Sequence, residues 1–348
     1  MNILITGSAG FFGNYVTNYF VNKGHNIIGM DNLSRKGSEL NSKIQIENRK
    51  VNFIKCDISN VQELKSCLKE KKFDWIVNCA ADPSVLSGFN NSSRKLIDNN
   101  LISTINLLEI CKDIKCGFIL MSTSKVYSIK ELSKIDKFEE SNRFSLINNC
   151  GIKESFSTDS PISLYGSTKL TSEILAKEYS QMFNFPLWIN RCGVIAGAGQ
   201  FGKIDQGVFS FWIYSWLRKT PLKYIGFGGN GKQVRDIVHP FDICEVINRQ
   251  IQDRNLEEDP IYNIGGGDEN SMSLKELSDW CYTNIRKDDN IVTSSSDERP
   301  FDIPIFVMDS TKAKKRWGFK ITYSKNQILE EIKYYAVNNP KFIEYLYS

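Results

Sequence analysis

Two side chains near the middle of the chain have the types and the spacing of an acid–base pair. Tyr165 and Lys169 stand in Tyr-Gly-Ser-Thr-Lys, and the segment Asp159-Ser-Pro161 before them is typical of a helix start. The spacing i, i+4 then places both side chains on one face of the helix. A lysine ammonium beside a phenol favours the phenolate and lowers the pKa of the tyrosine from its usual value of about 10. Tyr165 is therefore a candidate general base for a substrate hydroxyl, and an exposed helix turn is the alternative.

The hydroxyl of Thr123 is the third candidate for this chemistry. It follows an expected strand, Phe118–Met121, within the segment Met121-Ser-Thr-Ser-Lys-Val-Tyr127. From the end of that strand it could hydrogen-bond the hydroxyl that Tyr165 deprotonates and orient it. We expect Thr123, Tyr165 and Lys169 to be the catalytic residues.

A glycine pattern near the N-terminus predicts a site for a dinucleotide. Gly7, Gly10 and Gly13 follow an expected strand, Asn2–Thr6, and precede an expected helix, Asn14–Lys23. Glycines permit a tight turn and let a pyrophosphate approach the backbone, and the helix N-terminus offers free N–H groups and a positive dipole end. The spacing is G-x-x-G-x-x-G, so the strand before it and the helix after it carry much of the argument.

Asp31 predicts which dinucleotide the site takes. It lies eighteen residues beyond Gly13, at the end of the second expected strand. A carboxylate there accepts hydrogen bonds from ribose hydroxyls and repels a 2′-phosphate, which favours NAD over NADP. Arg35 and Lys36 argue the other way, because a basic side chain can accommodate that phosphate. A surface carboxylate next to an ordinary glycine turn is the alternative.

The elements that must position these residues alternate between strand and helix. The further expected strands are Asn26–Met30, Val51–Lys55, Trp75–Asn78, Leu187–Arg191 and Ile261–Ile264, and the further expected helices are Val61–Lys71 and Leu96–Lys112. Short apolar strands separated by helical patterns predict an α/β fold, a doubly wound parallel sheet covered on both faces. The polar stretch Ile129–Ser160 has no such pattern, and we interpret it as a long functional or disordered loop.

Composition argues against several other classes of protein. The 44 basic and 40 acidic residues give a net charge of +4 with the signs interspersed, which disfavours a nucleic-acid partner. Only two histidines are present, so we expect no metal site and no Ser-His-Asp hydrolase. The sequence has no apolar run of membrane-spanning length, and we expect no signal peptide. Nine irregularly spaced cysteines without a C-x-x-C pair indicate reduced thiols and a cytoplasmic location.

Taken in order, the motifs resemble those of the extended short-chain dehydrogenases/reductases, the family of nucleotide-sugar epimerases and dehydratases. Besides the motifs above, the resemblance rests on Asp57, Asn78-Cys-Ala-Ala81 and Asn99. It covers nearly the whole chain. It implies a Rossmann-type NAD domain at residues 1–186, with returning segments near 187–193 and 232–264. It also implies a smaller C-terminal domain, mainly residues 194–348, that binds a nucleoside diphosphate sugar.

The same resemblance implies where the cofactor, NAD, is held. Asp57 and Ile58 would lie near the adenine, and Lys169 would hold the nicotinamide ribose. The implied cofactor-binding residues are Gly7, Gly10, Phe11, Phe12, Gly13, Asp31, Asn32, Arg35, Asp57, Ile58, Ala80, Ala81, Asn99, Tyr165 and Lys169.

Within the family, the residues after Thr123 discriminate between reactions. The 4,6-dehydratases carry Thr-Asp-Glu at this strand end, whereas Ser124 and Lys125 follow Thr123 here, which disfavours dehydration. Reductases of 4-keto sugars use NADPH, and Asp31 argues against that cofactor. The reaction that remains is epimerisation with tightly held NAD.

Longer segments are similar to the CDP-tyvelose epimerases, also named CDP-paratose 2-epimerases. These segments are Asp31–Gly37, Ser124–Tyr127, Gln200–Gly207 and Gly229–Asp236, together with the insertion at 129–160. The likeness implies inversion at C2 of a CDP-dideoxyhexose through a transient 2-keto intermediate, with a role in polysaccharide biosynthesis. A UDP- or GDP-sugar 4-epimerase with the same Thr, Tyr and Lys chemistry is the alternative. An inactive NAD-binding sensor or scaffold is a third hypothesis.

The family likeness also implies the residues that bind the substrate. Arg235 and Arg299 match its phosphate-binding arginines, whose planar fork suits phosphate; surface ion pairs with Asp236 or Asp302 are the alternative. The remaining implied substrate residues are Ser84, Ser124, Asn190, Gln206, Gly207, Val208, Tyr224 and Gln233. The helices Leu96–Lys112 and Leu164–Phe183 would form the interface of a homodimer or homotetramer, or else belong to the core.

Overall fold

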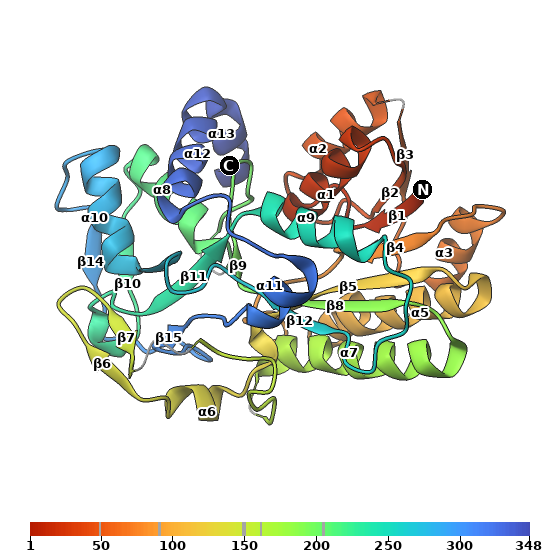
Figure 1. Cartoon of the computed structure of the whole chain (residues 1–348). Coiled ribbons are helices and arrows are strands. Elements are labelled where there is room, and N and C mark those ends of the chain that lie inside the picture. Colours follow the sequence, from red (N-terminus) through yellow and green to blue (C-terminus); the bar gives the residue numbers. More distant parts are fainter. Residues whose placement is uncertain (49, 90–91, 148–150, 161, 204–205) are drawn as a thin grey trace.

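A seven-stranded parallel sheet is the centre of the molecule (Figure 1). The computed structural model describes residues 1–48, 50–89, 92–147, 151–160, 162–203 and 206–348, so Pro161 of the expected helix start lies outside the described residues. The sheet order is β12-β8-β5-β4-β1-β2-β3. Its strands are β1 (Asn2–Thr6), β2 (Asn26–Asp31), β3 (Val51–Lys55), β4 (Trp75–Asn78), β5 (Gly117–Thr123), β8 (Leu187–Cys192) and β12 (Ile261–Ile264). Every strand expected from the sequence is confirmed.

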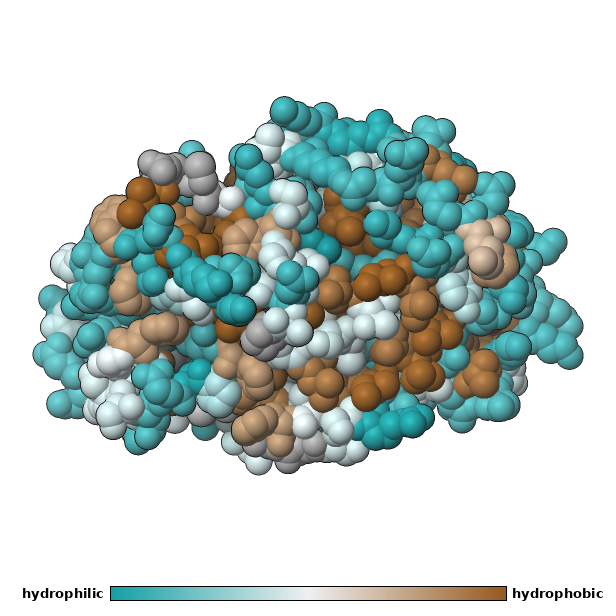
Figure 2. All heavy atoms as spheres, turned by 90° about the horizontal axis from the view of Figure 1, so that it is seen from below, coloured by the Kyte–Doolittle hydropathy of each residue, from teal (hydrophilic) through white to brown (hydrophobic). Residues whose placement is uncertain are grey.

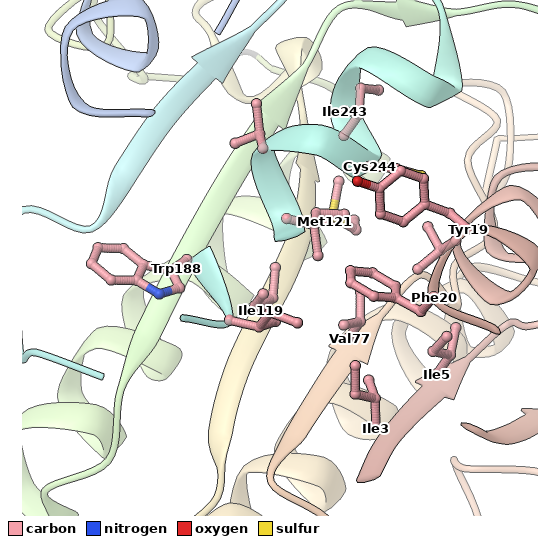
Figure 3. Packing of buried hydrophobic residues seen from close by; sticks show 14 of the residues in the cluster. Ile3, Ile5, Tyr19, Phe20, Val77, Ile119, Met121, Trp188, Ile243 and Cys244 are labelled. Atoms are coloured by element: carbon pink, nitrogen blue, oxygen red, sulfur yellow. The ribbon is translucent and has the colours of Figure 1, made fainter. Parts of the chain in front are cut away.

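Helices cover both faces of this sheet, because its strands are apolar on both sides. One layer contains α1 (Phe11–Asn22), α9 (Pro240–Gln250) and α11 (Thr311–Trp317), and the other contains α3 (Val61–Leu68), α5 (Ser103–Ile114) and α7 (Ser163–Phe183). Figure 3 shows the first layer, in which Phe20 of α1 lies near Val77 of β4, and Ile243 and Cys244 of α9 lie near Met121 of β5. The doubly wound α/β fold is therefore confirmed.

Two helices differ from the sequence prediction. The helix expected over Leu96–Lys112 is interrupted: α4 (Ser93–Ile97) runs into a π-helical turn, η1 (Asp98–Ile102), before α5 begins. Asn100 in this turn is buried and donates to the carbonyl of Asp82 at 3.1 Å. In addition, α2 (Ser38–Glu47) was not predicted, because its apolar residues are few and it buries polar ones such as Gln45.

A second group of elements packs at the carboxyl ends of the strands, on the left in Figure 1. It consists of β9 (Val194–Ile195), α8 (Val208–Arg218), β10 (Leu222–Tyr224), η4 (Phe227–Gly229), β11 (Val234–Val238), β13 (Ser271–Ser273), α10 (Leu274–Asn284), β14 (Val292–Ser294), β15 (Ile305–Phe306), α12 (Lys325–Asn338) and α13 (Pro340–Tyr347). It has its own apolar core, which includes Trp212, Leu277 and Ile328. The exact domain boundaries stay a prediction. No helix in the described part of the chain is both long enough and apolar enough to cross a bilayer.

The insertion at 129–160 is more ordered than the sequence predicted. The turn η2 (Ser124–Val126) leads into α6 (Ile129–Ser133), and β6 (Lys137–Glu139) pairs with β7 (Phe144–Leu146) as an antiparallel hairpin. The hairpin lies against the second group, where the amide of Phe144 donates to the carbonyl of Lys232 at 3.0 Å. Leu146 packs with Val234 and Ile305. The expectation of a disordered loop is therefore wrong for residues 129–146, because these scattered apolar residues are buried by long-range contacts rather than by a local pattern. Residues 148–150 lie outside the described residues, and a functional role of the insertion stays a prediction.

Candidate active site

A cavity of about 840 Å³ lies between the carboxyl ends of the sheet strands and the second group of elements. The glycine loop, Asp31 and Asp57 line one part of it. Thr123, Tyr165 and Lys169 line the middle, and Arg235 and Arg299 line the part next to the second group. Strand ends in a parallel sheet meet at one edge, which explains why residues so far apart in sequence share one cavity.

The glycine loop forms a close-packed turn before α1. Gly7 has φ of +65°, and a Cβ there would lie 2.8 Å from the backbone nitrogen of Ala80. A Cβ at Gly13 would lie 1.9 Å from the carbonyl oxygen of Gly7. No side chain caps the N-terminus of α1 at Gly10, so its first amides and its dipole face the cavity. Only glycines fit this turn, and the turn offers the donors that a pyrophosphate needs.

Asp31 stands at the end of β2 with its carboxylate partly buried. It accepts hydrogen bonds from the amides of Leu33 at 2.8 Å and Ala9 at 3.1 Å. Burial raises its pKa, and these amide donors oppose the rise. Each oxygen keeps a lone pair that a ribose hydroxyl could use. The guanidinium of Arg35 is tethered to the carbonyl of Phe201 at 2.7 Å, so part of its hydrogen-bonding capacity goes to the second group.

The other residues predicted for the cofactor also reach this cavity. Its lining includes Phe11, Phe12, Asn32, Asp57, Ile58, Ala80, Ala81 and Asn99. The cavity therefore gathers every predicted cofactor residue. The glycine turn lets a phosphate approach its backbone, and Asp31 places a carboxylate at the end of β2. Together with the elongated cavity, these features fit a dinucleotide.

Tyr165 and Lys169 stand one turn apart on α7, and Thr123 ends β5. The pKa of the Tyr165 phenol is raised to about 12, mainly by burial. The charge of Asp82 adds to this rise, and a hydrogen bond with Thr123 opposes it. The prediction that Lys169 lowers this pKa is wrong for the protein without ligands. The reason is that the phenol is removed from water, and this desolvation is the largest effect on its pKa.

Lys169 is only 2% exposed, and burial lowers its pKa to about 8. The negative charge of Glu173, one turn further along α7, works against this effect and keeps the ammonium form more stable. Glu173 is in turn bound by Arg191 of β8, with an N···O distance of 2.7 Å, and accepts a hydrogen bond from the hydroxyl of Ser122. The sequence analysis missed Glu173, although its i, i+4 spacing from Lys169 was a signal that could have found it.

Arg235 and Asp302 form an ion pair at 2.6 Å, and both side chains are mostly buried. Arg235 also donates to the carbonyls of Val234 at 2.7 Å and Ile303 at 2.8 Å, which fixes its orientation. The predicted residues Ser124, Gln206, Gly207, Val208, Gln233 and Arg299 line the same cavity. A surface ion pair is therefore not an adequate description of Arg235, since its pair lies at the wall of the cavity.

Three predicted substrate residues do not line the cavity. Asn190 is fully buried, and its amide exchanges two hydrogen bonds with Gln250, at 2.9 and 2.8 Å, so it holds α9 against β8. Tyr224 stacks on Trp212 with ring centroids 5.9 Å apart. The hydroxyl of Ser84 accepts a hydrogen bond from the amide of Leu86 within a turn. All three side chains are therefore occupied by packing or by hydrogen bonds within the fold. Their positions in the sequence do not reveal these contacts.

The cavity also contains residues that the sequence analysis did not select. Lys125 lines it next to Ser124, and Asp82 and Cys192 line it near Tyr165. Leu346 of α13 reaches it from the C-terminal end of the chain. Lys125 was recoverable from the sequence, because it stands where the dehydratase pattern has a glutamate. Leu346 was not, because nothing local marks the helix that carries it.

A family described as the NAD dependent epimerase/dehydratase family matches residues 3–265. The chain is 29% identical to CDP-paratose 2-epimerase of Salmonella typhi over 92% of this chain and 96% of that protein. It is 27% identical to UDP-glucuronate 4-epimerase of Thermodesulfobacterium geofontis over 98% of both.

Among solved structures, the chain is similar to UDP-glucuronic acid 4-epimerase from Bacillus cereus in complex with UDP-glucuronic acid and NAD. The TM-score is 0.79 and the identity is 26%, with 97% of this chain and 99% of that chain covered. The similarity therefore includes both the sheet and the second group of elements.

Proposed function

Because the chain belongs to the NAD dependent epimerase/dehydratase family, we propose that it inverts C2 of a CDP-dideoxyhexose, as in the conversion of CDP-paratose to CDP-tyvelose. It is an isomerase of nucleotide sugars with NAD as its cofactor. The observation that carries the narrower proposal is the match to CDP-paratose 2-epimerase over nearly the full length of both proteins. The residues after Thr123 support it, because Ser124 and Lys125 provide no carboxylates for a dehydration.

The chain's own residues fit NAD at the glycine loop and Asp31. The amides at the start of α1 would hold the pyrophosphate, and the carboxylate of Asp31 would accept hydrogen bonds from ribose hydroxyls. When bound, oxidised NAD supplies the hydride acceptor and a positive charge that favours the phenolate of Tyr165. Lys169 adds a second positive charge to the same part of the cavity.

Tyr165 would remove the proton of the C2 hydroxyl as the C2 hydride leaves, which gives a planar 2-keto sugar. Thr123 hydrogen-bonds the phenol in the structure and would share the hydroxyl with it. After the sugar presents its other face, C2 would regain a hydride while the oxygen regains the proton from Tyr165, and this gives the C2 epimer. The net redox change is zero, so the cofactor need not be exchanged between turnovers.

Inversion needs the sugar to turn over while the rest of the substrate stays bound. Arg235 and Arg299 would hold the diphosphate, and Arg235 is fixed by Asp302 and by two carbonyls. A fixed phosphate group is the pivot for such a turn, because rotation about the glycosyl–phosphate bonds leaves the nucleotide in place. The hairpin β6–β7 of the insertion packs on β11, whose Arg235 lines the cavity, and would help to exclude water from the keto intermediate.

We also propose that the enzyme is a homodimer or homotetramer that assembles through α5 and α7. Figure 2 views the side of the molecule on which α7 lies and shows apolar surface there. Leu164, Ile174 and Met182 of α7 are 38%, 53% and 74% exposed. Light scattering of the protein and of Ile174→Asp tests this, since the substitution is expected to dissociate the assembly.

The described cysteines are free, which supports a reducing, cytoplasmic location.

The test of the function begins with denaturing the purified protein and identifying the nucleotide that it releases. CDP-paratose, UDP-glucuronate and UDP-glucose are then offered separately in D₂O, and the products are followed by NMR. Inversion at C2 of the CDP-sugar without deuterium at C2 is expected. Inversion at C4 of a UDP-sugar would favour the 4-epimerase alternative, which the match to UDP-glucuronate 4-epimerase supports. Deuterium at C2 would refute hydride transfer.

A further inference from the structure

Lys125 is held rigidly at its backbone while its side chain borders the active-site cavity. It lies in η2, two residues after Thr123, and its amide donates to the hydroxyl oxygen of Thr123 at 3.2 Å. A Cβ at Gly166 of α7 would lie 2.2 Å from the carbonyl oxygen of Lys125, so α7 packs closely on this peptide. The turn is therefore fixed between the catalytic strand and the catalytic helix, and only the flexible side chain can move.

The charges around Lys125 do not balance in the protein without ligands. The groups that face it are Arg235, Arg299 and Asp302. Asp302 is already paired with Arg235 at 2.6 Å. In the described part of the chain, no hydrogen bond or ion pair joins the ammonium of Lys125 or the guanidinium of Arg299 to an acidic group. With Lys125 protonated, three basic groups face one carboxylate, which leaves two positive charges in excess at the wall of the cavity. This excess matches the two negative charges of a diphosphate.

The protonation of Lys125 responds to this imbalance. Burial, and then the positive charge of Arg235, lower its pKa to about 7, while Asp302 works against them. Near neutral pH the side chain is therefore close to half protonated. An anion that enters the cavity would stabilise the ammonium form and raise the pKa again.

We propose that Lys125 is a third cation for the substrate diphosphate, beside Arg235 and Arg299, and that it takes up a proton when the nucleotide sugar binds. This inference rests on the proposed nucleotide-sugar binding and adds a residue and a pH dependence to it. A lysine suits the role because its ammonium is a point charge on a long stem. Its flexible stem lets the ammonium approach a diphosphate that Arg235 and Arg299 already hold in place.

The direction of the pH effect follows from linkage. At pH 6 Lys125 is already protonated, so binding takes up almost no proton. At pH 8 the free protein has a mostly neutral Lys125, so binding takes up close to one proton, and affinity falls as pH rises through 7 to 9. Arg235 and Arg299 stay charged throughout. Lys169 is the other cavity lysine with a lowered pKa, at about 8, and it has Glu173 as its own partner.

The test measures binding of CDP to the NAD-bound enzyme by calorimetry at pH 6 and pH 8, in buffers of different ionisation enthalpy. We expect uptake of roughly one proton at pH 8, where the terminal phosphate of CDP is already ionised. At pH 6 that phosphate, with a pKa of about 6, also titrates, so the proton count there should be the same in the wild type and in Lys125→Met. Lys125→Met should abolish the uptake and weaken CDP binding about tenfold at pH 7, whereas Lys125→Arg should restore the affinity without any uptake. Lys130→Met, which removes an exposed lysine of α6 five residues further along the chain, should match the wild type.

Two outcomes would overturn the proposal. One is proton uptake at pH 8 that persists unchanged in Lys125→Met, which would assign it to Lys169. The other is unchanged CDP binding in Lys125→Met together with lost binding of the CDP-sugar, which would place the lysine on the sugar instead. UDP serves as a second probe, because the diphosphate is common to both. If neither CDP nor UDP binds to the wild type, the proposed function fails as well; if both bind, only the role of Lys125 is in question.

Discussion

Arg191 holds the carboxylate of Glu173 in a buried, two-pronged ion pair. The Nε of Arg191 lies 3.1 Å from both carboxylate oxygens, and one terminal nitrogen lies 2.7 Å from Oε2. Both side chains are at most 5% exposed. Glu173 lies one turn beyond Lys169 on α7, and it also accepts a hydrogen bond from Ser122, which precedes Thr123 on β5. The ion pair is therefore connected to both elements that carry the catalytic residues. It therefore sets both the charge state of Lys169 and the packing of α7 on the sheet.

Replacing Glu173 with glutamine should shift the pH dependence of turnover. The negative charge of Glu173 raises the pKa of Lys169, which burial lowers to about 8, so its removal lowers that pKa further. In the proposed mechanism Lys169 acts as a cation, whose charge would favour the phenolate of Tyr165 during turnover. We expect the alkaline limb of kcat against pH to move down by about one pH unit. Glu178→Gln, an exposed change on the same helix, should leave the profile in place. An unmoved limb in Glu173→Gln would contradict this role.

Replacing Arg191 with methionine should destabilise the fold, because it leaves the carboxylate of Glu173 buried and without its main partner. The expected loss is about 3–5 kcal/mol in the free energy of unfolding, measured as a shift of the urea midpoint. The double variant Arg191→Met/Glu173→Leu should recover most of this loss, because it removes both charges from the buried site. A double variant no more stable than the single one would show that the loss comes from packing instead.

Replacing Tyr165 with phenylalanine should abolish most turnover without unfolding the protein. The phenol is buried, and the substitution removes one oxygen and one hydrogen bond with Thr123. We expect kcat to fall by about 10²–10⁴, the usual contribution of a general base, with bound NAD and the melting temperature nearly unchanged. Tyr19→Phe removes a phenol that hydrogen-bonds Glu245 outside the cavity, and it should keep full activity. Full turnover in Tyr165→Phe would remove this tyrosine from the mechanism.

The parts of the molecule that could be predicted from sequence are those set by local signals. The seven sheet strands are short apolar runs between turn residues, and the glycine loop follows the first of them, so both were recognisable without knowledge of their partners. Parallel strands bring their ends to one edge, which explains why Thr123, Asp31 and the glycine loop were correctly gathered at one site.

The parts that could not be predicted depend on contacts between distant segments. Asn190 was expected at the substrate, but Gln250, sixty residues away, takes up its amide. The expected effect of Lys169 on Tyr165 failed because the burial of both groups is a property of the folded core. The hairpin of the insertion forms against β11 and β15, and its strands have three residues each, too few for their alternation to stand out in the sequence.

Replacing Asp31 with asparagine should relax the preference for NAD. Asparagine keeps one acceptor oxygen, which can serve only one of the two amides of Ala9 and Leu33, and it loses the charge that repels a 2′-phosphate. We expect the ratio of affinities for NAD and NADP to fall by about ten- to a hundredfold, measured on protein stripped of nucleotide. Asp57→Asn, at the end of β3, is the matched control and should weaken both dinucleotides equally. An unchanged ratio in Asp31→Asn would leave the discrimination to other residues.

Replacing Leu346 with serine should make the enzyme lose its cofactor. Leu346 is carried by α13 to the wall of the cavity, where it lies close to Gly37 in the loop after β2. The hydroxyl of Tyr347 donates to the carbonyl of Gly202 at 2.8 Å, and Tyr345 hydrogen-bonds Glu39, so the C-terminal helix is fastened on both sides of the dinucleotide part of the cavity. An epimerase that returns its hydride in each cycle gains from a cofactor that stays bound, and an apolar side chain over the site slows its escape.

The expected result for Leu346→Ser is faster release of NAD and a lower NAD content after purification, with kcat restored when NAD is added in excess. Because Ile343 of the same helix belongs to the core, a point substitution at Leu346 is a cleaner test than removal of α13. Val337→Ser removes an exposed aliphatic side chain of α12 and should keep the NAD content of the wild type. If Leu346→Ser retains NAD as well as Val337→Ser does, the C-terminal helix has no part in holding the cofactor, and its contacts with Glu39 and Gly202 serve the fold alone.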